Sequence, residues 1–276
     1  MTAHLKHWLE RELGTSCAKA ILPVMQEHYR LAHIRKPEFM GNTREEEKNP
    51  VYRVVKDLPW SEREINERLN AYSQLSETVE KAASKVSADR RSAYFELVKY
   101  PVQAAAQMNR KLLYAQLARH DKADWEKSDA AYDSIAALTQ HYNSLENGKW
   151  NRMMDFKPRK LPVFNRVERK AATAPMTADR KAVCQWNGAE AKKGNAIVCE
   201  GLGYEGKAAE IRKGDALTFS FGNLKTDSVE VDIRLLPNHP VQDDKLRFSV
   251  SLDGAEPEVV AYLSLIHISE PTRPRL

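Results

Sequence analysis

The hydrophobic pattern changes its period midway along this 276-residue chain. Up to about Leu145, apolar residues recur at helical spacing, as in the stripe that begins at Ile65. After Lys181, short apolar runs and alternation prevail, most clearly from Val229 to Leu235. A chain of this length can hold two domains of ordinary size. The pattern therefore predicts a multidomain α then β protein, with an antiparallel helical bundle followed by a β-sandwich.

Local signals divide the first half into helices. They are predicted over residues 4–13, 15–34, 61–85, 90–118 and 123–145. Ser61 and Glu64 have the spacing of a capping box, in which each residue satisfies a free amide at the helix start. Pro23 should kink the second helix or delay its start, and Pro101 predicts a bend, because proline has no amide to donate. Gly148 is the expected C-terminal cap of the last helix.

The second half predicts short strands. They are expected near residues 182–186, 196–199, 208–211, 217–221, 229–236, 246–252 and 259–262. Asp253 and Gly254 should form a tight hairpin turn between the last two. Many short strands without intervening helices are typical of a sandwich.

The charge balance excludes strong nucleic-acid binding. Lys and Arg number 43 against 38 Asp and Glu, which leaves a net charge of only +5. The basic residues are densest from Lys149 to Lys170. A solvated linker is one interpretation of this segment, and contact with an acidic polysaccharide or a neighbouring subunit is the other.

The sequence offers no catalytic, metal or cofactor site of its own. Glu45, Glu46 and Glu47 are adjacent in a charged loop, and Glu62 and Glu64 are explained by capping. The eight histidines and three cysteines have no metal-ligand spacing. An odd number of cysteines cannot form a complete disulfide framework, although Cys184 and Cys199 could meet across a sheet. No apolar run reaches the ~20 residues that a membrane-spanning helix needs.

Two segments carry a resemblance to a known family. Tyr94-Phe95-Glu96-Leu97-Val98-Lys99-Tyr100-Pro101-Val102 and Gly148-Lys149-Trp150-Asn151-Arg152-Met153-Met154-Asp155 resemble the helical domain of glycoside hydrolase family 115. Phrases after residue 202, such as Leu236-Pro237-Asn238-His239-Pro240, are similar to the family's C-terminal β domain. Together the resemblance covers most of residues 4–262.

The resemblance implies a function for a longer protein. Members remove glucuronic acid or 4-O-methylglucuronic acid side chains from xylan by inverting hydrolysis, with their acid and base in a barrel that precedes the helical domain. No positions here match that barrel, so the chain is expected to be a C-terminal, accessory fragment that is inactive alone. The intact parent is expected to meet glucuronoxylan through its catalytic domain, to form a homodimer, and to be periplasmic or secreted in a bacterium.

The expected organisation follows from these patterns. A helical bundle domain spans residues 1–147, a basic linker 148–180, and an incomplete, truncated β-sandwich 181–262. Residues 263–276 form a non-native tail, since Leu263 to Arg273 resembles the in-frame translation of a transposase sequencing adaptor. On this interpretation, Met1 is an internal codon read as a start.

Lys149, Trp150, Asn151 and Arg152 form the candidate substrate-binding segment. Trp150 can stack on a sugar, and the basic residues can pair with a uronate carboxylate. The alternative is that Trp150 closes the bundle beside the methionines that follow. The family commonly has His where Arg152 stands, which leaves the role of that side chain open.

A non-catalytic polysaccharide-binding or scaffold module is the alternative function. An exposed, coplanar strip of aromatic rings would favour it, and the suitable residues in the predicted strands are Trp186, Tyr204, Phe219 and Phe221.

Overall fold

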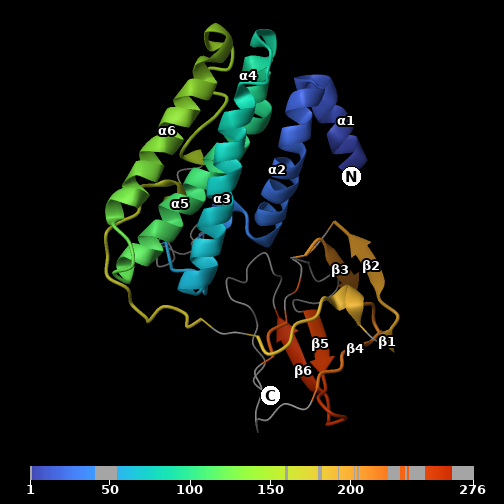
Figure 1. The fold of residues 1–276 in the computed structure, drawn as a ribbon. Coiled ribbons are helices and arrows are strands. Elements are labelled where there is room, and N and C mark those ends of the chain that lie inside the picture. Colours follow the sequence, from blue (N-terminus) through green and yellow to red (C-terminus); the bar gives the residue numbers. More distant parts are fainter. Residues whose placement is uncertain are drawn as a thin grey trace. The chain divides into compact units, whose positions relative to one another are not determined.

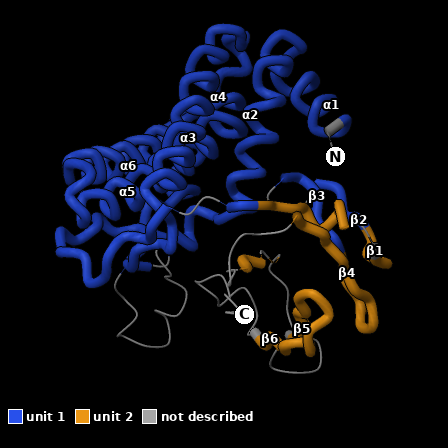
Figure 2. The backbone as a smooth tube through the Cα atoms, turned by 60° about the horizontal axis from the view of Figure 1, so that its bottom comes forward, with its two compact units in different colours: residues 1–183, 198–209 blue, residues 184–197, 210–276 orange. Residues whose placement is uncertain are grey.

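The computed structural model describes residues 2–40, 55–158, 161–179, 182–191, 193–201, 203, 205–222, 231–233, 235 and 246–262 (Figure 1). The chain divides into two compact units (Figure 2). Unit 1 comprises residues 1–183 and 198–209, and unit 2 comprises residues 184–197 and 210–276. Unit 1 contains the described α-helices.

The helical bundle is built from long helices that pack in chain order. The α-helices are α1 (Thr2–Leu13), α2 (Thr15–Ile34), α3 (Glu62–Ala83), α4 (Arg91–Tyr94), α5 (Tyr100–Arg119) and α6 (Trp125–Gly148). Short 3-10 turns are η1 (Pro37–Phe39), η4 (Ala88–Arg90), η7 (Pro162–Phe164) and η8 (Gly188–Glu190). Helix α1 packs on α2, α2 on α3, α3 on α5, and α5 on α6. The predicted bundle is therefore confirmed.

The ends of the first helices agree with the sequence signals. Gly14, with a φ of 83°, separates α1 from α2 in a conformation that glycine adopts without strain. Pro23 does not delay the second helix, which already begins at Thr15. Ser61 caps α3: its hydroxyl accepts from the Glu64 amide at 3.3 Å, and the Glu64 carboxylate accepts from the Ser61 amide at 2.9 Å. The predicted capping box is confirmed.

Removing this cap should destabilise the helical unit. Ser61→Ala is expected to lower the free energy of unfolding by about 1 kcal/mol, because the Glu64 amide loses its acceptor. Chemical unfolding followed by far-ultraviolet circular dichroism measures the change. Ser84→Ala, at the exposed other end of α3, is the control and should change stability by less than about 0.5 kcal/mol. Equal effects of the two substitutions would contradict the role of the capping box.

The bend expected at Pro101 takes the form of a π-helical turn. Residues Phe95–Lys99 form this turn, η5, and Pro101 lies in the first turn of α5. Proline cannot donate to the carbonyl four residues earlier, and its ring crowds that carbonyl. A wider turn immediately before Pro101 accommodates both effects. The irregularity therefore precedes the proline instead of coinciding with it.

Helix α6 ends in a run of left-handed residues. Leu145 leaves helical geometry with a ψ of 150°, and Glu146, Asn147 and Gly148 follow with φ values of 51°, 57° and 82°. The predicted glycine cap is thus the last of three consecutive residues with positive φ. Regular helical geometry therefore ends at Ser144, four residues before Gly148.

Two clusters of buried residues form the core of the bundle. The first core cluster joins α1, α2 and α3 with residues from Val86 to Ala106. The second core cluster joins the start of α3 to α5 and α6, and it includes Val163 and Val167. These two valines belong to residues 161–179, which we call the strap. The strap is packed onto the bundle, with Val163 completely buried.

The described strands form three two-stranded sheets. The strands are β1 (Lys193–Gly194), β2 (Ile197–Glu200), β3 (Lys207–Glu210), β4 (Leu217–Thr218), β5 (Leu246–Val250) and β6 (Glu258–Tyr262). Strand β1 pairs with β4, β2 with β3, and β5 with β6 in antiparallel register from Leu246 opposite Tyr262 to Val250 opposite Glu258. A β part therefore follows the helices, and the sandwich itself stays a prediction.

Several strand predictions need correction. Residues 182–186 are not a strand; their apolar side chains do not supply the backbone partner that a strand requires, and β4 pairs with residues 193–194. Most of the predicted strand 229–236 lies outside the described residues, and residues 231–233 and 235 are not extended into a strand. Asp253 and Gly254 do form a turn, with φ values of 50° and 76° typical of type I′. It lies within a longer connection, residues 251–257.

The β part has little core of its own. Val260 is the one buried residue among the described positions from 182 to 262. Large apolar side chains stay exposed there, with Val183 at 82%, Val259 at 63% and Ile211 at 52%. This stretch therefore leaves apolar surface that its own described residues do not cover.

Candidate functional site

The predicted segment Lys149–Arg152 forms tight turns directly after α6. The Asn151 amide donates to the Gly148 carbonyl at 2.9 Å, and the Met153 amide donates to the Trp150 carbonyl at 2.9 Å. Arg152 has a φ of 64°. We call residues 145–154 the post-α6 loop, because regular helical geometry ends before Leu145 although α6 is assigned to Gly148.

The structure brings two of the four predicted residues into contact. The Lys149 ammonium lies 4.6 Å from the centroid of the half-buried Trp150 ring, within cation–π distance. Asn151 and Arg152 are exposed. The buried Nε1 of Trp150 has no hydrogen-bond partner among the described residues. A buried N–H without an acceptor is uncommon in proteins.

Two side chains outside the predicted segment hold the loop in place. The Asn143 amide group donates to the Met154 carbonyl at 2.9 Å and accepts from the Met154 amide at 3.0 Å. The Ser92 hydroxyl donates to the Glu146 carboxylate. Neither residue was predicted from the sequence. Asn143 lies eleven positions from Met154 and Ser92 lies fifty-four positions from Glu146, and no sequence motif pairs residues at these separations.

Backbone strain is concentrated in this loop. Glu146, Asn147 and Arg152 are non-glycine residues with positive φ. Each such residue costs on the order of 1 kcal/mol, and strained residues of this kind cluster at functional sites. The strain and the unpaired indole N–H both favour a role for the loop beyond closing the bundle.

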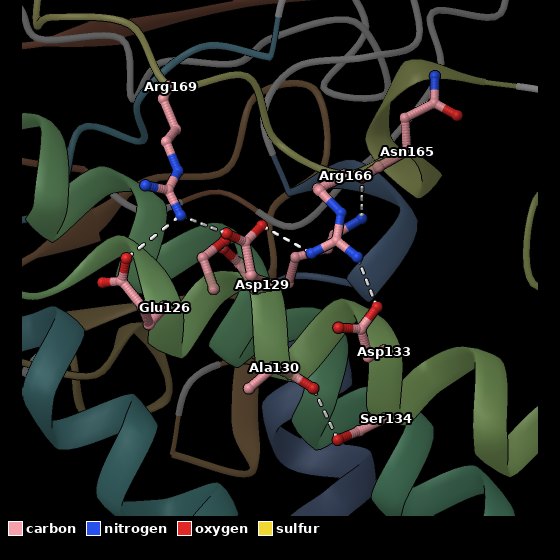
Figure 3. Close-up of polar contacts among 10 residues, drawn as sticks. Glu126, Asp129, Ala130, Asp133, Ser134, Asn165, Arg166 and Arg169 are labelled. Carbon is pink, nitrogen blue, oxygen red and sulfur yellow. Dashed lines mark hydrogen bonds and ion pairs between the residues drawn. The ribbon is translucent and has the colours of Figure 1, made fainter.

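Two arginines of the strap form ion pairs with carboxylates of α6 (Figure 3). Arg166 donates to Asp129 at 2.8 Å and to Asp133 at 2.5 Å, and Arg169 donates to Asp129 at 2.7 Å and to Glu126 at 3.3 Å. All three acids lie on α6. Both arginines hold the pKa of the Asp129 carboxyl below its ordinary value of 3.8. These two members of the basic segment are thus engaged with the bundle.

Asp129→Asn should loosen the strap in a salt-dependent manner. The ion pairs are exposed, so we expect a loss of at most about 1 kcal/mol in the free energy of unfolding, and less at high salt. Because folding lowers the pKa of Asp129, this contribution is present above pH 3.8 and disappears as pH falls through the folded-state value. Urea unfolding at low and high salt measures it. Asp121→Asn removes the same charge from an exposed residue; matching losses from both variants would contradict the prediction.

A buried lysine of the bundle donates hydrogen bonds to the backbone of the strap. Lys111 of α5 is completely buried, and its ammonium donates to the carbonyls of Val163 and, at 2.8 Å, Asn165. Burial, and secondarily the nearby charge of Lys157, lower the pKa of Lys111 to about 7. Sequence analysis missed this residue. Its position beside Leu112 and Leu113 on a core helix was the available signal.

The aromatic residues considered for polysaccharide binding meet only in part. Trp186 lies 5.9 Å from Phe219 and 5.7 Å from Phe221 between ring centroids, with interplanar angles of 37° and 42°. The three rings form a cluster, but tilts of this size do not make a coplanar strip. Tyr204 lies outside the described residues.

Asp57 and Asp179 pair with basic side chains of the bundle. Asp57 contacts Arg119 and lies 2.9 Å from Nε2 of His120, and Asp179 contacts Arg63 at 2.9 Å. Glu45, Glu46 and Glu47 lie outside the described residues. Cys17, Cys184 and Cys199 are not joined in a disulfide, so the pairing of Cys184 with Cys199 that the sequence left open is absent among the described residues. Within the described ranges, no three His, Cys, Asp or Glu side chains are grouped as metal ligands, and no helix could span a membrane.

Comparison with known proteins relates the chain to a solved enzyme. No family profile and no curated protein sequence gives a match. A solved structure is described as a novel family GH115 4-O-methyl-alpha-glucuronidase, BtGH115A, with specificity for decorated arabinogalactans. It matches 95% of this chain at 94% sequence identity and a TM-score of 0.86, and the match spans 35% of the BtGH115A chain. The chain therefore belongs to glycoside hydrolase family 115, as a part about a third as long as that relative.

Proposed function

We propose that this chain is an accessory, non-catalytic part of a glycoside hydrolase that removes 4-O-methylglucuronic acid side chains from a plant polysaccharide. The observation that carries the proposal is the 94% identity to BtGH115A over 95% of this chain. At that identity the two sequences specify the same local fold and nearly the same surface chemistry.

The carboxylates support an accessory role. Inverting hydrolysis needs a carboxylic acid with a raised pKa and a carboxylate base, roughly 6.5–9.5 Å apart. Asp129 has the opposite shift, because two arginines donate to it. Glu64 is committed to the cap of α3, and Asp57 to Arg119 and His120. Groups that are paired in this way are poor candidates for the acid and the base.

Decorated arabinogalactan is the substrate class we favour for the whole enzyme. The sequence resemblance implied glucuronoxylan, whereas BtGH115A is described with specificity for decorated arabinogalactans. Both polysaccharides can carry the same uronic acid group. The choice rests on the 94% identity with that enzyme.

The post-α6 loop is the proposed point of contact with substrate or with the catalytic domain. Its exposed Arg152 can donate a bidentate pair to a uronate carboxylate, and Lys149 lies beside the Trp150 ring. The left-handed backbone at Arg152 fixes the direction in which that side chain leaves the loop.

Arg152→Ala should reveal which partner the loop meets. Placed in a BtGH115A hybrid that carries this chain, the substitution is expected to raise KM at least about fivefold with little change in kcat, as for loss of one charge-assisted hydrogen bond. Lys122→Ala, another exposed basic residue of unit 1, is the control. An unchanged KM combined with a lowered melting temperature would assign the loop to domain contact instead.

The exposed apolar residues favour assembly with further polypeptide. Covering the exposed side chains of Val183, Ile211 and Val259 would be favourable, because it removes apolar surface from water. Another domain of the same enzyme or a second subunit could provide the cover. The homodimer expected from the family resemblance remains a proposal, and sedimentation of the hybrid enzyme measures it.

Domain replacement tests the accessory role. The matched third of BtGH115A is either replaced by this chain or deleted. The replacement should retain release of 4-O-methylglucuronic acid, because the two segments are 94% identical. The deletion should lose thermal stability and activity together. A deletion variant with full activity and an unchanged melting temperature would refute the accessory role.

A further inference from the structure

A shallow groove with a mixed apolar and polar lining lies beside the π-helical turn. It has a volume of about 400 Å³, opens broadly to solvent, and lies where residues of α3, η5, α5 and α6 meet. Phe95 and Lys99, the first and last residues of the turn, both line it. The segment from Tyr94 to Val102, which resembles the family, thus contributes to a groove that has no role in the proposed function. Irregular helical turns of this type occur frequently at functional sites.

The groove offers both hydrogen-bond donors and hydrogen-bond acceptors, and its charged side chains cancel. Lys99 and Glu80 are paired at 2.8 Å, so their charges cancel while both keep capacity for further hydrogen bonds. The Gln103 amide donates to Glu80 at 3.1 Å and to the Ser76 carbonyl at 3.3 Å, which orients it within the wall.

Two further side chains are available to a ligand. The amide of Gln107 and the imidazole of His141 line the groove and have no hydrogen-bond partner among the described residues. His141 is exposed, and its ring stands edge-on to Phe95 with 4.4 Å between centroids. This packing fixes the imidazole plane against a buried aromatic ring.

We propose that this groove binds a short stretch of a neutral polysaccharide chain. Sugar hydroxyls donate and accept at once, as the amide, imidazole and paired charged groups require. The cancelled charge of Glu80 and Lys99 disfavours an ionic ligand. The apolar part of the lining, which includes Phe95 and Leu138, can pack against the C–H faces of sugar rings while the amide and imidazole groups bond their hydroxyls. Because the groove is open and not enclosed, it suits a chain lying across it better than a small molecule that must be surrounded.

Affinity electrophoresis of the 276-residue chain through gels containing arabinogalactan tests the proposal. The inference rests on the proposed function only for the choice of this polysaccharide. Wild-type protein should be retarded, and the Gln107→Ala/His141→Ala double variant should bind at least about fivefold more weakly, as expected from losing two hydrogen bonds. Gln140→Ala, an exposed substitution on α6 that does not line the groove, should leave retardation unchanged.

The remaining outcomes separate the groove from other surfaces. Unretarded wild-type protein would overturn the proposal. Loss of retardation in Trp186→Ala, with the groove variant still retarded, would move binding to the aromatic cluster and also overturn it. Neither result affects the accessory role, which the domain replacement tests by activity. Circular dichroism of each variant distinguishes lost binding from lost folding.

Discussion

Replacing Arg68 with methionine is expected to lower the free energy of unfolding by about 3 kcal/mol or more, the largest effect of any single substitution considered. Arg68 is 6% exposed and lies in the centre of the bundle. Its guanidinium donates to Asn109 at 2.6 Å, to the Leu31 carbonyl at 3.1 Å and to the Arg35 carbonyl at 2.8 Å. It therefore joins α3 to α5 and closes the C-terminal end of α2.

Methionine would fill most of the space but donate to none of these acceptors. The Leu31 carbonyl keeps the Arg35 amide as a donor at 3.1 Å, so the loss falls on the Asn109 amide oxygen and the Arg35 carbonyl. Each buried acceptor left without a donor costs about 1–3 kcal/mol.

The guanidinium also lies 5.3 Å from the Trp60 centroid and 5.4 Å from that of Tyr72, so cation–π attraction is lost as well. Burial, and secondarily the charge of Arg68, lower the pKa of Arg35 to about 10. Removing Arg68 relieves this repulsion between the two guanidinium groups, which offsets part of the loss.

Urea unfolding followed by circular dichroism measures this effect. Arg110→Met is the matched control, because Arg110 lies on the surface side of α5 and makes a weaker contact, 3.3 Å to the Ser73 hydroxyl. It should change stability by no more than about 0.5 kcal/mol. A loss below about 1 kcal/mol for Arg68→Met would mean that the guanidinium contacts contribute little net stability.

The second large effect is a pH dependence that belongs to Lys111. Its pKa is about 7 in the folded protein and returns to the ordinary value of 10.5 on unfolding. Between these values the unfolded chain binds more protons than the folded one, so stability rises with pH. The gain begins near pH 7 and is complete only above pH 10.5.

Comparison with Lys111→Met isolates this contribution. From about pH 6 to about pH 9, the free energy of unfolding of wild type should rise by about 2 kcal/mol relative to that of the variant. This is less than the pKa difference alone would give, because two carbonyls accept from the ammonium form and favour it. Lys85→Met, which removes an exposed lysine, should follow wild type over the same range. A constant difference between wild type and Lys111→Met would show that Lys111 stays protonated throughout.

Sequence reasoning succeeded where the deciding interactions are local. The capping box at Ser61 and Glu64 marks the start of α3 because both groups lie within one helical turn. The helical stripes predicted α1, α2 and α5 for the same reason. Pro101 indicated an irregularity, but the sequence did not predict its form, a π-helical turn that precedes the proline.

It failed where the deciding contacts join distant residues. The segment after α6 is densely basic and was interpreted as a solvated linker or a polysaccharide contact. In the structure Arg166 reaches Asp129, thirty-seven positions earlier, and Lys111 reaches Val163 across fifty-two. No pattern within one segment encodes such pairs. The role of the segment Lys149–Arg152 stays a prediction; its position after α6 was readable from the sequence, whereas its backbone strain and its support from Asn143 required the structure.

Release of 4-O-methylglucuronic acid from decorated arabinogalactan is the most direct test of the account. The purified chain and BtGH115A are incubated at equal molar concentration with the same polysaccharide, and the free acid is quantified by chromatography. The chain should release no more than a blank without protein, while BtGH115A releases the acid. Release by the chain above the blank, abolished by substituting one of its own carboxylates, would contradict the claim that it is a non-catalytic part of the enzyme.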